Sequence, residues 1–533
     1  MLNMFNKKSL RIFLLLALVL SLTLTGCQNN NEVLDESSTE EAVNETIQVV
    51  DEDETIVLAG KRHLAPGEED GYYCSSILYV WEPLIRQGKN GEPLPSLAED
   101  WEMSEDGKEW IFKLREGVTF HDGQVFNADA VIANFDRMSL GIKPSSYYPL
   151  DIDSHYPGLV SYEKIDDYNI KLVFDESKPT QLYRMINWGS AIYSPENFDE
   201  EGNFNGIAMG TGPFKIVDNQ KDDYVLLERY EDYWGESAKA KSIKVRSIPD
   251  VDTRYSALKA GEIHGTLDLD SLTPALAEEL KKDDNFLIAE SKSTMIRFLV
   301  TNGELEPFND IRLKEAISLA LNRQDIVDIV YFGYGSPTTN ILNYSTPFYK
   351  EYPVEENMER AKELAKEVLG EERLETEFLI NGNDPTQKTE AELIAPWLAE
   401  IGIDVTIQPM EYSVLRERLK EGDFGFARLQ QGLSNGEPST IFRRFMLTSG
   451  DHNKNYSLGY DIEELNNLME SANKELDVNN LETIYDKVQE LSTTTYPVFP
   501  LFNDVNIMGY SNKLSNYNAE LYGLELPEVE WTK

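Results

Sequence analysis

Strand-like and helix-like segments alternate along the chain from about Thr55 to its end. Apolar residues recur with period two at 110–114 and 169–174, which is typical of half-buried strands. A helix is indicated at 127–138, where Asn127 can cap the first turn. Because helices and strands alternate in this way, the sequence predicts an α/β fold.

The second half of the chain has the clearest βαβ pattern. A helix ending near residue 400 leads to a predicted strand at 403–408, a helix at 412–420 and a strand at 424–429. This order predicts parallel strands, because a helical crossover returns the chain to the same edge of a sheet. A long strand-like run at 293–301 precedes this region, and another follows Tyr496.

The N-terminus has the pattern of a secretory signal. Three basic residues precede an apolar run that is too short to span a membrane stably, and Leu24-Thr25-Gly26-Cys27 follows. These four residues closely resemble the lipobox of bacterial lipoproteins. The resemblance implies cleavage after residue 26, lipidation of Cys27 and an extracytoplasmic protein that is anchored to the cell membrane.

Residues 27–54 form the predicted tether between this anchor and the folded body. Residues 28–54 contain ten carboxylates, no basic residue and no aromatic residue, a composition that favours a solvated, disordered segment. The whole chain carries a formal charge of −45, from 94 acidic and 49 basic residues. Nucleic acid is therefore excluded as an expected partner, because phosphate contacts need clustered Lys and Arg.

The usual signatures of catalysis and cofactor binding are missing from the sequence. It contains no GxxxxGK[ST], GxSxG, HExxH or paired CxxC motif, and its five histidines are scattered. We therefore predict no cofactor and no metal site. A hydrolase that uses two carboxylates stays open as an alternative, because chance pairs are common in so acidic a chain.

His121, Asp122 and Gly123 are the residues that most suggest an acid–base centre. They follow the strand at 110–114 and stand just before the helix cap at Asn127. Asp followed by Gly is favourable in a turn, because Asp can bond to its own backbone and Gly accepts positive φ. The segment is thus interpreted as a turn, with a locally hydrogen-bonded histidine.

An ordered series of motifs resembles the extracytoplasmic solute-binding proteins of family 5, which serve ABC importers of peptides, nickel chelates and related solutes. The motifs are Trp81-Glu82-Pro83-Leu84, Pro95-Ser96-Leu97-Ala98-Glu99-Asp100-Trp101, Phe120-His121-Asp122-Gly123, Phe126-Asn127-Ala128-Asp129, Gly210-Thr211-Gly212-Pro213-Phe214, Tyr230-Glu231-Asp232-Tyr233-Trp234-Gly235 and Ile311-Arg312-Leu313-Lys314-Glu315-Ala316. The resemblance covers about residues 55–530.

The resemblance implies a two-lobed, periplasmic-binding-protein-like α/β fold of type II, in the class of the large peptide binders. The larger lobe is expected at 55–301, with an inserted subdomain at about 86–200. The second lobe is expected at 302–495, and residues 496–533 should return to the larger lobe. Such a protein closes on its ligand between the lobes and is not an enzyme.

The resemblance also implies a substrate-binding lipoprotein that delivers short peptides to ABC permease subunits with their ATPases. A nickel or metal-chelate receptor is the alternative within the family. A structural surface lipoprotein, like the hydrolase, belongs to a different class.

Ligand-lining residues are carried over from the family segment by segment. Tyr72, Tyr73 and Trp188 would offer flat surfaces to the ligand. In the loop at 429–442, Gln431 stands where peptide-binding relatives have a Trp, and Glu437-Pro438 replaces Asp-Pro.

Two charged residues complete the expected site. Glu437 is expected to pair with a peptide's α-amino group, and its alternative is an ordinary exposed acid. Arg428, which ends a predicted strand beside the loop, is the expected partner of a ligand carboxylate.

Overall fold

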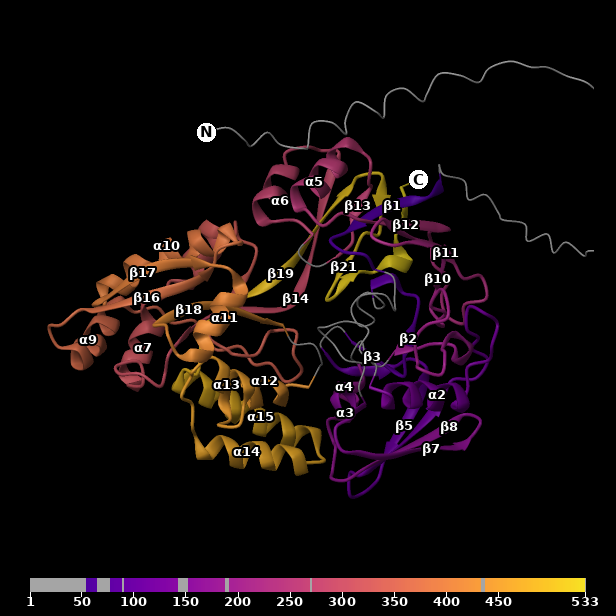
Figure 1. Ribbon diagram of the computed structural model, residues 1–533, viewed down its shortest axis with the longest axis horizontal. Helices are drawn as coiled ribbons and strands as arrows, with labels where there is room; N and C mark the ends of the chain where they lie inside the picture. Colours follow the sequence, from indigo (N-terminus) through magenta and orange to yellow (C-terminus); the bar gives the residue numbers. More distant parts are fainter. Residues whose placement is uncertain are drawn as a thin grey trace, which may run out of the picture. The chain divides into compact units, whose positions relative to one another are not determined.

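The computed structural model describes residues 54–64, 77–88, 91–141, 152–186, 191–268, 271–432 and 437–532 (Figure 1). The predicted signal peptide, Cys27 and nearly all of the tether lie outside these residues. Within the described ranges, no helix is both long enough and apolar enough to cross a membrane.

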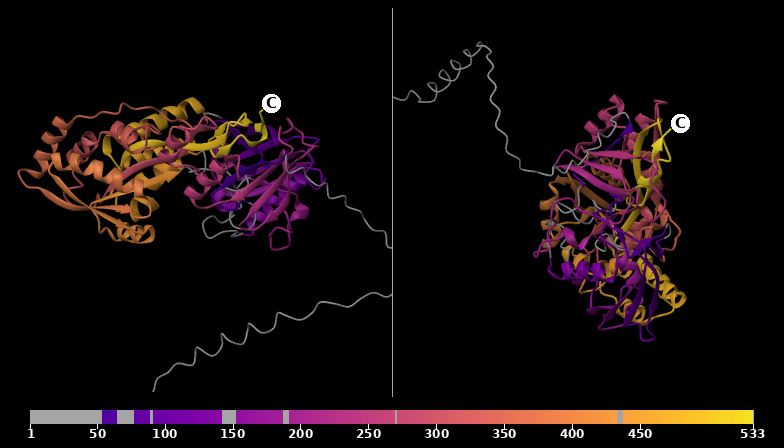
Figure 2. Two further views of the ribbon diagram at one scale, coloured as in Figure 1. Left: turned by 90° about the horizontal axis from the view of Figure 1, so that it is seen from above. Right: turned by 90° about the vertical axis from the view of Figure 1, so that its right-hand side faces the viewer.

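One mixed sheet of eleven strands extends through both lobes. Ten strands lie in the order β10 Phe214–Gln220, β11 Tyr224–Arg229, β12 Ser242–Ser247, β1 Ile56–Gly60, β13 Gly265–Thr266, β19 Phe499–Ser511, β14 Phe286–Thr301, β18 Phe426–Gly432, β16 Leu374–Asn381 and β17 Ile403–Met410, and β15 Ser336–Pro337 pairs with β19. The long strands β14 and β19 are antiparallel, with Phe286 opposite Ser511 and Leu299 opposite Phe499. They pass from one lobe to the other, as Figure 2 also shows.

The larger lobe is built on β1, which runs parallel to β12 and β13. Its helices are α5 Val251–Ala260 and α6 Pro274–Leu280, and its last elements are β20 Leu514–Ser515, β21 Ala519–Glu520, β22 Gly523–Leu524, η5 Leu526–Glu528 and β23 Glu530–Trp531. Met508, Leu524 and Val529 pack into one hydrophobic cluster with Ile56 and Leu58. Side chains from residues 508–529 thus form part of the core of the larger lobe.

A four-stranded antiparallel sheet, in the order β5-β6-β8-β7, forms the centre of the inserted subdomain. Asn127 caps its main helix as predicted, because its side-chain oxygen accepts a hydrogen bond from the Ala130 amide at 3.1 Å. The elements of this region are β2 Glu82–Pro83, β3 Ile85–Gln87, β4 Pro93–Pro95, β5 Ala98–Met103, β6 Glu109–Leu114, α2 Ala128–Ser139, α3 Ile152–His155, β7 Leu159–Asp166, β8 Asn169–Phe174, α4 Gln181–Met185, β9 Ala191–Ile192 and η3 Pro195–Asn197.

The predicted βαβ pattern of the second lobe is confirmed. Strand β16 pairs in parallel with both β17 and β18. The helices of this lobe are α7 Ile311–Ala320, α8 Arg323–Asp325, η4 Ile326–Val330, α9 Met358–Leu369, α10 Pro385–Glu400, α11 Tyr412–Glu421, α12 Ser439–Met446, α13 Asp451–Asn455, α14 Glu463–Lys474 and α15 Val478–Thr495. Strand β18 begins later than predicted and continues to Gly432, because it pairs with β14 as far as Met295.

Two hydrophobic clusters, drawn entirely from residues 296–502, form the core of the second lobe. The inserted subdomain has its own cluster, which includes Phe112, Phe126 and Phe135. The residue boundaries given for the lobes above stay predictions.

Candidate ligand-binding site

The His121-Asp122-Gly123 segment is a turn, as predicted. The Asp122 carboxylate accepts a hydrogen bond from the Gln124 amide at 3.0 Å, and His121 Nε2 lies 2.9 Å from the Gly212 carbonyl oxygen. Burial lowers the pKa of His121 to about 4, so the ring is neutral at neutral pH. These contacts give His121 a structural role.

Three of the signature motifs meet around the carboxylate of Glu82. It accepts hydrogen bonds from Tyr233 Oη at 2.7 Å, Trp234 Nε1 at 2.7 Å and Thr211 Oγ1 at 2.9 Å. The Arg115 guanidinium lies over the Trp234 ring at 4.4 Å. The side chain of Glu82 thus joins three motifs that are far apart in the sequence, and this role is structural.

Arg428 is buried in the second lobe. Its Nε lies 2.8 Å from Glu390 Oε1, and both side chains of this ion pair are 0% exposed. Its other hydrogen bonds go to Tyr331 Oη, Glu390 Oε2 and the Leu429 carbonyl oxygen. The guanidinium is thus engaged inside its own lobe, and its ion partner is Glu390. The predicted contact of Arg428 with a ligand carboxylate stays a prediction.

Gln431 turns its side-chain oxygen toward helix α13. This oxygen lies 2.8 Å from His452 Nε2, and the amide nitrogen donates to the Gly432 carbonyl oxygen at 2.5 Å. Burial lowers the pKa of His452 to about 4. The ring is therefore neutral at neutral pH, with Gln431 facing its Nε2 and the Asp451 carboxylate 3.2 Å from its Nδ1.

Among the predicted site residues that the structure describes, Glu437 makes the most hydrogen bonds. Its side chain is 1% exposed, which is unlike the ordinary exposed acid of the alternative interpretation. Its carboxylate accepts hydrogen bonds from Arg184 Nη2 at 3.0 Å, Tyr485 Oη at 3.1 Å and the Ser439 amide at 3.1 Å, and from the hydroxyl groups of Ser439 and Thr440. Burial and the charge of Glu437 raise the pKa of Tyr485.

The Arg184–Glu437 ion pair joins the two lobes. Arg184 lies on the short helix α4, which follows the four-stranded sheet of the subdomain, and Glu437 directly precedes α12. Next to this pair, the rings of Tyr183 and Phe348 pack with centroids 5.5 Å apart. Phe348 also packs against Tyr485, so α4 contacts an aromatic cluster of the second lobe as well as its buried acid.

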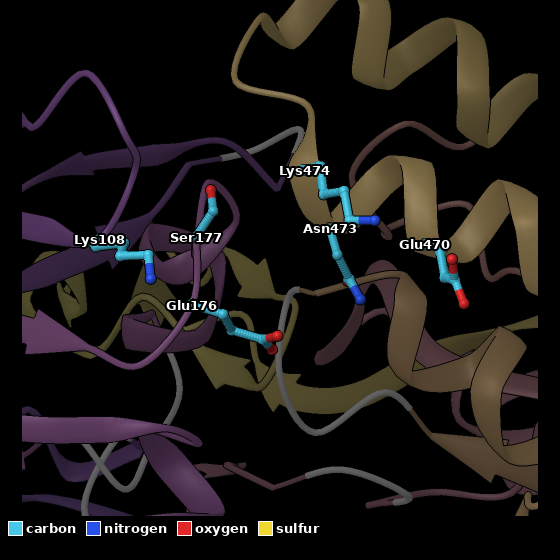
Figure 3. A pocket seen from close by; sticks show the side chains of 6 residues that line it. All are labelled: Lys108, Glu176, Ser177, Glu470, Asn473 and Lys474. Carbon is cyan, nitrogen blue, oxygen red and sulfur yellow. The ribbon is translucent and has the colours of Figure 1, made fainter.

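A polar cavity of about 440 Å³ lies between the loop after β8 and helix α14. Figure 3 shows Glu176 and Asn473 extending into it from opposite walls. Lys178 lowers the pKa of the Glu176 carboxyl group. The lining residues are Lys108, Glu176, Ser177, Glu470, Asn473 and Lys474.

Tyr72, Tyr73 and Trp188 lie outside the described residues, so their place in the site stays a prediction. In the part of the chain that the structure describes, no group of three or more His, Cys, Asp or Glu side chains could hold a metal ion. Sequence reasoning missed Arg184 and Tyr183. No local pattern could have found Arg184, because its partner is 253 residues away.

The model of the family described as "Bacterial extracellular solute-binding proteins, family 5 Middle" matches residues 92–453, which is more than half of the chain. The chain belongs to this family. The predicted family and the two-lobed, periplasmic-binding-protein-like α/β fold are therefore confirmed.

Two curated relatives and one solved structure show how far the similarity extends. Heme-binding protein A of Haemophilus influenzae is 27% identical over 482 residues, which cover 85% of this chain and 87% of the relative. The dipeptide-binding protein of Escherichia coli is 27% identical over 429 residues, which cover 75% of this chain and 78% of the relative. The structure of HbpA2 from Haemophilus parasuis matches 90% of this chain and 100% of its own with a TM-score of 0.78 and 25% identity.

Proposed function

We propose that this family 5 protein captures short peptides between its lobes and delivers them to the permease subunits of an ABC importer with their ATPases. The observation that carries the proposal is the contact between α4 and Glu437, where charged and aromatic side chains of both lobes meet. Closure of two lobes on a ligand gives the open and closed states different ligand affinities, which a transporter can recognise. In this proposal Tyr72, Tyr73, Trp188 and Gln431 line the same site.

Ligand-dependent stabilisation tests this function directly. The purified lipoprotein, in detergent, is heated with a pool of random tripeptides and tetrapeptides, with nickel–histidine or with heme. We expect the peptides to raise the melting temperature, since a ligand at 100 times its Kd stabilises the folded state by about 2.7 kcal/mol. A shift with nickel–histidine or heme alone would contradict the peptide assignment and favour a receptor for that compound.

The same samples test the hydrolase alternative. A receptor releases its ligand unchanged, so mass spectrometry after incubation should recover the peptides intact. Cleaved peptides would overturn the proposal that the protein is not an enzyme. A structural surface lipoprotein would show no shift with any compound.

Membrane attachment through Cys27 is also part of the proposal. Cys27→Ser removes the thiol that would carry the lipid, whereas Cys74→Ser removes the only other thiol and serves as the control. We expect the first variant to leave the membrane fraction and the second to stay in it. Membrane association of Cys27→Ser equal to that of the unmodified chain would refute the lipid anchor.

A further inference from the structure

We propose that Arg184, oriented by Glu437, binds a carboxylate group of the ligand. This inference rests on the proposed function and makes it more specific, because it requires a peptide with a free carboxyl terminus. Glu437 is then a positioning residue, and the group that contacts the ligand belongs to the larger lobe.

The environment of Glu437 leaves little room for a ligand ammonium. A carboxylate offers about four lone-pair positions. Glu437 already accepts hydrogen bonds from Arg184, Tyr485, Thr440 and both the amide and the hydroxyl of Ser439. An ammonium group would have to displace Arg184 from a carboxylate that is 1% exposed.

Arg184, in contrast, has N–H groups that its contact with Glu437 does not use. A guanidinium group carries five N–H donors in a planar fork. Arg184 uses one nitrogen, Nη2, for its contact with Glu437, and among the described residues its Nε and Nη1 make no hydrogen bond. The side chain is 19% exposed, so a small molecule can reach these donors. Nη2 carries a second N–H, and together with the neighbouring N–H of Nε or of Nη1 it can donate two parallel hydrogen bonds to one carboxylate.

A second arginine makes the net charge of the site positive. Arg443, on α12, donates from Nη2 to Asn473 Oδ1 at 2.5 Å, and its buried Nε has no hydrogen-bond partner among the described groups. The charges of Arg184 and Arg443 both oppose the rise in the pKa of the Tyr485 hydroxyl, so the two guanidinium groups lie near the same side chain. Arg443 also acts on the carboxyl group of Glu176, which is itself paired with Lys178 at 2.6 Å. The three cations Arg184, Arg443 and Lys178 thus face the two carboxylates of Glu437 and Glu176, which leaves one positive charge for an anionic ligand.

The contact between Arg443 and Asn473 lies at the wall of a cavity. Asn473, the partner of Arg443, lines the polar cavity between the lobes, and Figure 3 shows its side chain extending into that cavity. Helix α4 is held against the second lobe by the Tyr183–Phe348 ring contact, which keeps Arg184 beside Glu437. The ligand carboxylate would thus meet a preorganised guanidinium at the junction of the lobes.

The experiment compares four end-group forms of one random pool of tripeptides and tetrapeptides: free, N-acetylated, C-amidated and blocked at both ends. Thermal-shift titration of the full lipoprotein measures the apparent affinity for each form. We expect amidation to weaken binding by about 10- to 100-fold, the loss typical of a charge-assisted hydrogen bond. N-acetylation should change binding by less than about 3-fold, because in this proposal no carboxylate is reserved for the ammonium.

Arg184→Gln should reduce the ratio of acid to amide affinity to about one, since its effect is confined to the carboxylate. Arg360→Gln is the matched control, because Arg360 forms an exposed Arg–Glu ion pair with Glu363 on α9; its ratio should equal that of the unmodified chain. Glu437→Gln should lower the ratio of acid to amide affinity, while the affinity for the C-amidated peptides stays unchanged. If Arg184→Gln alone unfolds because Glu437 is left buried and unpaired, the double variant Arg184→Gln/Glu437→Gln removes both charges and is tested for the same ratio.

Three results would overturn the inference. If acid and amide bind the unmodified chain equally, Arg184 does not recognise a carboxylate. If acetylation abolishes binding, Glu437 takes the ammonium as the sequence predicts. If Arg184→Gln weakens both forms equally, the residue only holds the lobes together. Failure of all four forms to bind would instead overturn the peptide function and, with it, this inference.

Discussion

Arg428→Met should lower the free energy of unfolding by about 3 to 5 kcal/mol, the usual cost of removing one partner from a buried ion pair. Arg428 and Glu390 are both 0% exposed, and Tyr331 donates to the same carboxylate at 2.7 Å. Without the guanidinium, the Glu390 carboxylate stays buried and loses its ion-pair partner. Urea unfolding at pH 7, followed by circular dichroism, measures the loss.

Two variants define how this loss is interpreted. Arg428→Met/Glu390→Leu should recover most of the stability, because neither charge is then left in the core. Arg373→Met breaks a pair with Asp404 in which the side chains are 52% and 43% exposed, and it should cost less than about 1 kcal/mol. A cost for Arg428→Met that is no larger than this control would contradict the structural role. If the stable double variant no longer binds peptides, Arg428 contacts the ligand after all.

Glu82→Ala should destabilise the larger lobe by about 3 to 6 kcal/mol, because one buried and two half-buried donors lose their acceptor and each then costs about 1 to 2 kcal/mol. The donors belong to Tyr233, Trp234 and Thr211, from two segments far along the chain from Glu82. Thermal unfolding of the purified protein, without peptide, measures the change.

Glu99→Ala is the matched control, because Glu99 is paired with exposed Lys113 and should cost less than about 1 kcal/mol. The pH dependence gives a second readout. Burial raises the pKa of Glu82 above its ordinary 4.5, although hydrogen bonds to Trp234, Tyr233 and Thr211 act in the opposite direction. The folded state therefore holds the proton more strongly, and this contribution to stability is lost as pH rises from 4.5 through the raised pKa. Glu82→Ala should lack that slope; equal slopes in both proteins would contradict the assignment.

Much of the fold could be predicted from local patterns. Asn127 caps α2 and Asp310 caps α7, because a short polar side chain before an apolar helical stripe bonds to a free backbone amide. The strands of the second lobe follow from their apolar spacing and from the helices between them. The bounds of β18 were predicted less well, since pairing with β14 sets where that strand ends.

The candidate site was harder to predict, because its interactions connect distant parts of the chain. Glu437 was singled out by its place in a family motif, and the structure shows that it is buried. Neither its burial nor its bond to Arg184 could be inferred, since both depend on how α4 packs against the second lobe. The same reason applies to Arg428, whose partner Glu390 lies on a helix 38 residues earlier.

By itself, the sequence determined the family, the βαβ pattern of the second lobe and the structural turn at His121, because motifs, caps and apolar periodicity act over a few residues. Only the tertiary structure decided which charges are neutralised within the protein and which keep donors for a ligand. A buried carboxylate binds whichever cation the fold brings beside it. For Glu437 that cation is Arg184, which lies 253 residues away on the other lobe.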